Sequence, residues 1–170
     1  MQIIADKAAE FFFHDTSLLY VYYEAIANAI DANATNIKID ITVPDFNDVN
    51  DFEISIEDNG DGFTDVNFER FKQILNTADE NHKGIGRLVF LNYFKNINIQ
   101  SFFENKSRTF TFSNNFNGES ELKENTNRVK GSKLIFKNYK KKKILSYDFV
   151  NPSPLKESIL LHFYPQFFWK

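Results

Sequence analysis

The sequence predicts a single domain of the α/β class, and three observations lead to this prediction. An apolar stripe at helical spacing runs through residues 16–32. Two segments of alternating apolar residues, 37–43 and 52–58, follow it and are typical of half-buried strands. The chain has 170 residues, 42% of them hydrophobic, which is enough for one domain with a buried core and too short for two full domains.

Composition excludes several classes of protein and of site. The net charge is −3 and the pI is near 5.6, so no overall basic field indicates nucleic-acid binding. The chain has no cysteine, so it forms neither a disulfide framework nor a thiolate metal site. No apolar run approaches the roughly 18–20 residues that span a bilayer, and the first residues lack a signal-peptide pattern. We therefore expect a cytoplasmic protein with no membrane partner.

Residues 16–32 are predicted to form the first helix. Its apolar stripe consists of Leu19, Tyr23, Ile26 and Ile30. Asp15 and Thr16 are expected to cap the first turn, because short polar side chains accept hydrogen bonds from free N–H groups there. Asn33 stands where the chain leaves the helix, and asparagine tolerates the left-handed conformation needed at that position.

The segment 52–58 is predicted to be a strand that ends in an unusual residue. Its inward positions are Phe52, Ile54 and Ile56, and a period of two places Asp58 on the same face. A carboxylate aimed at an apolar interior costs several kcal/mol of desolvation unless another group hydrogen-bonds it. Asp58 is therefore the strongest single-residue indication of a ligand contact in the sequence.

The remaining elements are predicted to be short. We expect helices at 66–76 and 87–94 with a polar segment at 77–83 between them, a hairpin of 97–103 and 108–112 around Asn105-Lys106, a last strand at 133–136, and a helix-like segment at 155–164 without an obvious partner. Residues 113–130 are predicted to form a long polar loop. The lysines at 140–143 are either a solvated loop or a contact for nucleic acid or a partner.

Three polar residues share one face of the first helix, beside its apolar stripe. Glu24, Asn28 and Asp31 stand at i, i+4 and i+7, and these positions lie together at 3.6 residues per turn. A carboxylate there can act as a general base toward water, and a neutral amide oxygen suits Mg²⁺ bound together with phosphate oxygens. Asp31 can orient neighbouring groups or bind water. Taken singly, each residue is more often an ordinary part of a solvated helix face.

Two glycine-containing segments follow the first helix. Asp58-Asn59-Gly60-Asp61-Gly62 is either a plain turn or a site where Asp58 accepts a hydrogen bond from an exocyclic amine such as that of adenine. Such an acceptor disfavours the carbonyl oxygen of guanine. Lys83-Gly84-Ile85-Gly86-Arg87 opens a helix, where free N–H groups bind anions and the two basic residues add positive charge. Its spacing is neither that of a Walker loop nor that of a dinucleotide fingerprint.

In this order the motifs resemble those of the GHKL ATP-binding superfamily: gyrase B-type topoisomerases, the heat-shock chaperone, sensor histidine kinases and MutL. Glu24-x-x-x-Asn28-Ala29-x-Asp31-Ala32 is similar to the N box of that superfamily, Asp58-x-Gly60-x-Gly62 to its adenine box, Gly84-Ile85-Gly86 to its phosphate-lid box, and Gly131-Ser132 to its last motif, where threonine is commoner. The resemblance covers roughly residues 16–137. It is strongest to the MutL, microrchidia and bacterial stand-alone branches.

The resemblance implies a fold, ligands and roles for particular residues. The fold would be a two-layer α/β sandwich, the Bergerat fold, in which a mixed and mostly antiparallel sheet carries helices on one face. ATP and Mg²⁺ would be bound, with Glu24 as catalytic base, Asn28 as metal ligand and Asp58 as adenine reader. The implied nucleotide-binding residues are Asn28, Asp31, Ala32, Asp58, Gly60, Gly62, Phe63, Lys83, Gly84, Ile85, Gly86, Arg87 and Ser132.

The resemblance also implies an organisation of the chain. Residues 16–140 would be the ATP-binding domain, preceded by a candidate dimer strap at 1–15 and followed by a linker and the start of another element at 141–170. The segment between Phe63 and Gly84 is short for a lid. In the topoisomerase and MutL branches a following transducer domain supplies a catalytic lysine, and we expect this domain to be missing here. We therefore expect an N-terminal fragment, or a minimal protein that needs a partner, with slow hydrolysis in isolation.

The function expected from these motifs is that of an ATPase module in a larger bacterial machine of the DNA-processing or defence type. ATP binding would drive homodimerisation, and a partner protein or downstream domain, with nucleic acid contacted through other domains, would respond. Two alternatives stay open at this point. One is a histidine kinase-type catalytic domain, for which His14 is the only upstream phosphate acceptor. The other is a non-catalytic nucleotide-binding interaction module.

Overall fold

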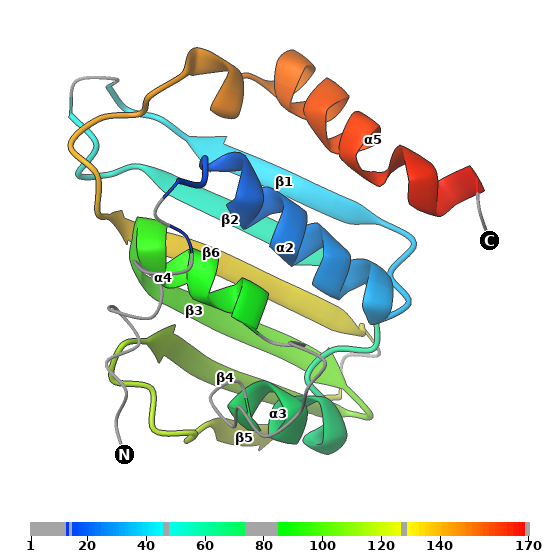
Figure 1. The fold of residues 1–170 in the computed structure, drawn as a ribbon. Helices are drawn as coiled ribbons and strands as arrows, with labels where there is room; N and C mark the ends of the chain where they lie inside the picture. The colour runs from blue at the N-terminus through cyan, green and yellow to red at the C-terminus, as the bar shows by residue number, and fades with distance from the viewer. Residues whose placement is uncertain (1–12, 14, 46–47, 74–84, 127–128, 169–170) are drawn as a thin grey trace.

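The computed structural model describes residues 13, 15–45, 48–73, 85–126 and 129–168, and these form two layers (Figure 1). One layer is a six-stranded sheet of β1 (Ile37–Thr42), β2 (Glu53–Asp58), β3 (Phe94–Phe103), β4 (Lys106–Ser113), β5 (Glu121–Glu124) and β6 (Gly131–Tyr139). The other contains α2 (Leu19–Asp31), α3 (Asp65–Lys72), α4 (Leu88–Tyr93) and α5 (Pro152–Phe168), with single 3₁₀ turns at η2 (Ile85–Arg87) and η3 (Tyr147–Phe149). The predicted two-layer α/β class is confirmed.

The strand order in the sheet is β1-β2-β6-β3-β4-β5, so the last strand of the chain lies in the middle. β6 pairs with β2 on one side and with β3 on the other, and it joins a β1–β2 hairpin to a β3–β4–β5 meander. All five described pairings are antiparallel. This topology brings the C-terminal ends of β2 and β3 next to the N-terminal end of β6, at one end of the sheet.

The two faces of the sheet differ in chemistry. The outer face is polar and carries ion pairs such as Lys38–Asp40 at 2.8 Å and Lys137–Glu53 at 3.1 Å. The inner face packs against the helices through apolar side chains. The largest fully buried residues of the core between the sheet and the helices include Tyr22, Phe52, Phe90, Phe94, Phe136 and Phe163. Because every strand alternates between these faces, one register fixes which side chains reach the helices.

The start of α2 differs from its prediction. The residue before the first turn is Leu18, which makes no side-chain capping bond, so Asp15 and Thr16 are not the caps that the sequence indicated. The Thr16 hydroxyl instead donates to the Phe13 carbonyl at 2.7 Å, and the Tyr93 hydroxyl donates to the Thr16 carbonyl. The prediction was wrong because tertiary contacts hold Thr16 in a turn ahead of the helix.

The end of α2 agrees with its prediction. Asn33 has a φ of 62°, and its N–H donates to the Ile30 carbonyl at 3.0 Å. The predicted hairpin is also confirmed, since β3 and β4 are joined at Glu104 and Asn105, whose φ angles are 47° and 61°. The predicted helices 66–76 and 87–94 correspond to α3 and to α4, and residues 74–84 lie outside the described part of the chain.

Residues 113–130 are not a continuous loop, because β5 (Glu121–Glu124) adds a strand to the free edge of β4. All four β5 residues are exposed, so the strand has no alternating apolar pattern by which the sequence could reveal it. Its main-chain hydrogen bonds to β4 and the Asn125 N–H bond to the Asn105 carbonyl at 2.6 Å hold it in place.

The C-terminal helix has a partner, although none was obvious in the sequence. In α5 the His162 ring stacks on Tyr23 of α2 at 3.8 Å between centroids, and Phe163 is 1% exposed. Ile144, Val150 and Leu155 are buried in the same core. The region expected to be a linker and a following element therefore packs in part on the domain.

The four lysines at 140–143 are exposed, as a solvated loop requires. Two of them also reach back to α4, where the Lys140 ammonium donates to the Leu91 carbonyl at 2.7 Å and Lys141 lies 3.4 Å from the Asn92 amide oxygen. The Lys140 contact serves a main-chain carbonyl at the C-terminus of α4, which has no partner within the helix. Across the described ranges, no helix is long and apolar enough to cross a membrane.

We predict that Phe136→Ala will lower the free energy of unfolding by about 3–5 kcal/mol, the usual cost of deleting a buried aromatic ring. Phe136 is fully buried in β6, with ring centroids 5.0 Å from Phe90 and 5.5 Å from Phe94. Urea unfolding followed by circular dichroism measures the change. Leu161→Ala is the matched control, because Leu161 is 68% exposed and its truncation should change stability by no more than about 0.5 kcal/mol.

Candidate active site

The polar face of α2 brings together the pair that the sequence singled out. The Asn28 amide donates to Glu24 Oε1 at 3.0 Å, one helical turn away. This bond fixes the orientation of the amide, because a carboxylate oxygen can only accept and Asn28 must present its NH₂ group. The Asn28 Oδ1 atom is thereby left for another partner. Asp31 lies further along the helix and is exposed.

The carboxylate of Glu24 lies against the glycine turn that precedes α4. A Cβ placed on Gly86 would be 2.1 Å from Glu24 Oε2, so only glycine permits this approach. Burial raises the pKa of Glu24, while the Asn28 hydrogen bond and the nearby Arg87 charge lower it in part. The net direction is upward, so Glu24 is a desolvated carboxylate with a raised affinity for a proton.

Arg87 brings a positive charge to the same place. Its guanidinium lies over the Phe71 ring of α3 at 4.7 Å, and burial lowers the pKa of Arg87 although Glu24 opposes the shift. The Nη1 atom is buried and has no hydrogen-bond partner among the described residues. A buried guanidinium nitrogen without a partner is costly, and a phosphate oxygen is a suitable acceptor for it. Of the same motif, Lys83 and Gly84 lie outside the described residues, and Ile85 is described only in its backbone.

Asp58 closes β2 on its inner face, as the alternation predicted. Its Oδ1 accepts the Gly60 N–H at 2.7 Å, and the Ser132 N–H also bonds to the carboxylate. Burial raises the pKa of Asp58, and these two main-chain bonds lower it in part. Gly60 has no room for a side chain, since a Cβ would lie 2.7 Å from the Ala32 carbonyl oxygen. The loop therefore passes close to the end of α2.

Ser132 lies opposite Asp58 in the β2–β6 register and is 6% exposed. Its hydroxyl lies 3.5 Å from the hydroxyl of Ser101 on β3. The Ser101 hydroxyl donates to the Gly131 carbonyl at 3.2 Å and accepts a hydrogen bond from the Phe63 N–H at 2.7 Å. These serines lie beneath the Asp58 loop, next to Gly62. The predicted residues Asp58, Gly60, Gly62, Phe63 and Ser132 are thus neighbours, although they come from distant parts of the sequence.

Hydrogen bonds join the Asp58 loop to the end of α2. The Asn59 Oδ1 atom accepts the N–H groups of Thr35 and Asn36, both at 2.9 Å. The Asp61 N–H donates to the Ala32 carbonyl at 2.7 Å, and the Asp61 carboxylate accepts from Asn33 at 2.6 Å. Ala32 therefore contributes to the site through its main chain and small size. The polar face of α2 and the Asp58 loop keep a fixed relation to one another.

Sequence reasoning missed two buried polar residues at this edge, Ser101 and Arg108, which are 0% and 5% exposed. Ser101 has no signal of its own in the sequence. Arg108 does have one, because it shares the inward face of β4 with Phe110 and Phe112 at a period of two. A charged residue on an inward face together with phenylalanines indicates a buried polar contact, as the inward Asp58 does, so Arg108 could have been singled out from the sequence.

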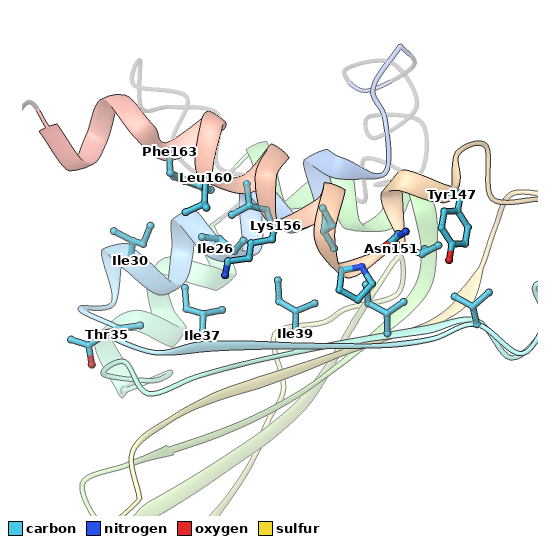
Figure 2. A pocket seen from close by; sticks show the side chains of 17 residues that line it. Ile26, Ile30, Thr35, Ile37, Ile39, Tyr147, Asn151, Lys156, Leu160 and Phe163 are labelled. Atoms are coloured by element: carbon cyan, nitrogen blue, oxygen red, sulfur yellow. The ribbon is translucent and has the colours of Figure 1, made fainter.

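A separate cavity of about 750 Å³ lies on the opposite side of α2, beneath α5 (Figure 2). Ile26 and Ile30 of α2, Ile37 and Ile39 of β1, and Leu160 of α5 line it. Its walls are mainly aliphatic, and neither Glu24 nor Asp58 reaches it. Since α2 presents opposite faces to the two places, this cavity is not part of the site around Glu24.

Comparison with known proteins fits the geometry of the site. Residues 16–144 match the protein family described as "Histidine kinase-, DNA gyrase B-, and HSP90-like ATPase". The chain belongs to this family. It is accordingly an ATP-binding module of the GHKL superfamily, as the motifs predicted. No curated protein sequence matches the chain.

Among solved structures, the ATPase domain of Thermus thermophilus gyrase B, described as 43K and in complex with an aminocoumarin, is similar to this GHKL domain with a TM-score of 0.55. The match covers 86% of this chain and 38% of that one, at 20% identity. Such an identity shows a shared fold. This domain thus spans well under half the length of the gyrase structure that it resembles.

We predict that Glu24→Gln will raise the Tm at pH 7. The folded state raises the pKa of Glu24, so it binds protons more readily than the unfolded state, and this contribution to stability is lost as pH rises through the folded pKa. A neutral glutamine removes that loss. Differential scanning fluorimetry should show the gain at pH 7 and little difference below pH 4.5, the ordinary glutamate value.

Glu119→Gln is the control for this comparison, because Glu119 lies exposed on a loop and its neutralisation should leave the Tm unchanged at both pH values. A Tm for Glu24→Gln equal to that of the wild type at pH 7 would contradict the desolvation of Glu24.

Proposed function

We propose that this domain binds ATP with Mg²⁺ and hydrolyses it, as the nucleotide-driven switch of a larger bacterial DNA-processing or defence machine in the cytoplasm. The observation that supports hydrolysis is the position of the Glu24 carboxylate. It is desolvated, held by Asn28, and directed at the Gly86 turn beside the buried guanidinium of Arg87. A base, an amide oxygen and an anion-binding turn are the groups that phosphate-ester hydrolysis requires.

The two carboxylate oxygens of Glu24 have different surroundings and different proposed roles. Oε1 accepts the Asn28 amide, which holds the side chain in place, and Oε2 faces the Gly86 turn. A water next to Oε2 gives its proton to this atom as its oxygen attacks the terminal phosphorus and the bond from phosphorus to the ADP oxygen breaks. Because burial raises the pKa of Glu24, the carboxylate is a stronger proton acceptor than an exposed glutamate.

The residues present fit a magnesium ion bound together with the phosphates. The Asn28 amide is oriented with its NH₂ toward Glu24, so its oxygen is the atom that would hold the metal. When bound, Mg²⁺ neutralises charge on the phosphate oxygens during transfer. Arg87 places its buried Nη1 where an anionic oxygen would satisfy it. The main chain of the Gly86 turn keeps the space between these groups free of side chains.

Asp58 and its surroundings support adenine as the base. The carboxylate is half-buried and already accepts N–H groups of Gly60 and Ser132, so it is held in one orientation. A second carboxylate lone pair can accept the exocyclic amine of adenine, while the carbonyl oxygen of guanine at that position would meet like charge. Gly60 and Gly62 let the loop pack tightly against Ala32 and Ser101, which holds Asp58 at a fixed place beside the end of α2.

The first test is the turnover of Glu24→Gln. We expect kcat for ATP hydrolysis to fall by about 10²–10⁴-fold, the usual contribution of a general base, while the Kd for ATP is retained. Phosphate release measures kcat and calorimetry measures the Kd. Because the variant keeps ATP bound without hydrolysing it, we expect the variant to accumulate as a homodimer in sedimentation experiments. Turnover equal to that of the wild type would remove Glu24 from the proposed role. Radiolabel left on the protein would indicate a phosphotransferase.

The second test concerns the base. Asp58→Asn should weaken ATP binding by about 10–100-fold, since a hydrogen bond to a charged acceptor is lost, and narrow the preference for ATP over GTP. The carboxamide can turn an NH₂ group toward the guanine oxygen, which a carboxylate cannot do. Asp40→Asn is the matched control, because Asp40 is exposed on the outer face of β1 and pairs with Lys38. Equal loss in both variants would contradict the assignment of Asp58.

A further inference from the structure

Arg108 is a buried cation that the proposed chemistry does not use. It lies on the inner face of β4 and is 5% exposed, among the phenylalanines of that face. Its guanidinium lies 4.5 Å from the Phe68 ring centroid of α3 and 5.2 Å from that of Phe103. An arginine is seldom buried in this way unless its donors meet defined acceptors, because removal of its charge from water is costly.

The two Nη groups of Arg108 donate to residues directly after the Asp58 loop, while its buried Nε has no hydrogen-bond partner among the described residues. Nη1 donates to the Phe63 carbonyl at 2.8 Å and to the Thr64 carbonyl at 3.0 Å. Nη2 donates to the Asp65 carboxylate, whose side chain is 67% exposed. A planar fork of donors suits these three acceptors, and the single ammonium group of lysine does not reproduce it.

Together with other hydrogen bonds, the bonds of Arg108 fix residues 62–65, where the Asp58 loop ends and leads into α3. The Phe63 N–H donates to Ser101 Oγ at 2.7 Å while the Phe63 carbonyl accepts from Arg108, so both polar groups of this residue are bound. The Gly62 carbonyl accepts the Asn67 amide at 2.8 Å, and the Thr64 hydroxyl accepts the Asn67 N–H at 3.2 Å. Residues 62–65 are thus held on the side of β4, and through Gly62 this anchor defines where the Asp58 loop ends.

We propose that Arg108 is a positioning residue for nucleotide binding, which holds Gly62 and Phe63 at the place where the base is bound. The inference rests on the proposed nucleotide site, since Arg108 acts through the loop. It acts on the end of the site that carries Asp58, at a distance from the groups around Glu24. Its loss should therefore change affinity for the nucleotide more than the rate of the bound complex.

The experiment compares three variants of the full chain. Arg108→Lys keeps the charge and loses the fork, Asp65→Asn keeps the two bonds to main-chain carbonyls and loses the exposed ion pair, and Arg70→Lys alters an exposed arginine of α3 as the matched control. ADP binding is measured by calorimetry, kcat at saturating ATP by phosphate release, and local opening by amide hydrogen exchange without nucleotide. All measurements are made well below the Tm of each variant.

We expect Arg108→Lys to raise the Kd for ADP about tenfold or more, with kcat at saturation within about twofold of the wild type. Asp65→Asn should raise the Kd less, by about two- to fivefold, as for an exposed ion pair, and Arg70→Lys should not change it. Exchange of the amides of residues 63–68 should be faster in Arg108→Lys, with exchange in β1 and β2 unchanged.

The outcomes separate this inference from the proposed function. A lower Tm for Arg108→Lys with an unchanged Kd would show that Arg108 only supports the fold, and this would overturn the inference. A wild-type protein that binds no ADP would overturn the proposed function. In that case the exchange of residues 63–68 still decides whether Arg108 fixes the loop, and uniform exchange across the domain would refute it.

Discussion

The site depends on the close approach of two backbones where β6 enters the sheet between β2 and β3. Gly131 begins β6 with a φ of 137°, and a Cβ there would lie 1.9 Å from the Asp58 carbonyl oxygen. Any side chain would push the strands apart at the point where Asp58 leaves the sheet. With glycine in place, the N–H of the next residue, Ser132, reaches the Asp58 carboxylate, and Ser101 of β3 bonds to the Gly131 carbonyl. One glycine thus joins the half of the domain that carries α2 to the half that carries α3.

The two sides of this junction carry ionisable groups whose charged forms are opposed by burial. Burial is the largest cause of the pKa shifts of Glu24, Asp58 and Arg87, and in each case it opposes the charged form. Each group is only partly compensated, by Asn28, by main-chain N–H groups, or by the opposite charge. Perturbed ionisable groups gathered in this way are characteristic of functional sites. The aromatic core around Phe136 supplies the stability that permits them, because its burial is independent of their charge.

The features that could be predicted from the sequence are those that follow from a local hydrophobic period or a short motif. The polar face of α2, the inward Asp58 and the left-handed Asn33 follow from spacing alone, and the structure has them as expected. The sequence could not predict partners chosen by tertiary contacts. β5 has four exposed residues and depends on the free edge of β4, and α5 is held by the stacking of His162 on Tyr23, which are far apart in the chain. Arg108 is an intermediate case, since its inward position was predictable and its acceptors at Phe63 and Thr64 were not.

The structure also connects the two ends of the site through α3. The inner face of this helix carries Phe68 and Phe71, each of which lies beneath a guanidinium group. Arg108, at the end that carries Asp58, lies 4.5 Å from the Phe68 ring, and Arg87, beside Glu24, lies 4.7 Å from the Phe71 ring. Both rings also pack on Phe110, with centroids 5.0 and 5.3 Å away. The polar partners of the two guanidinium groups differ, because Arg108 bonds to the residues that lead into α3 while Arg87 lies near Glu24. Phe68, Phe71 and Phe110 thus form one aromatic cluster that contacts the cation at each end of the site.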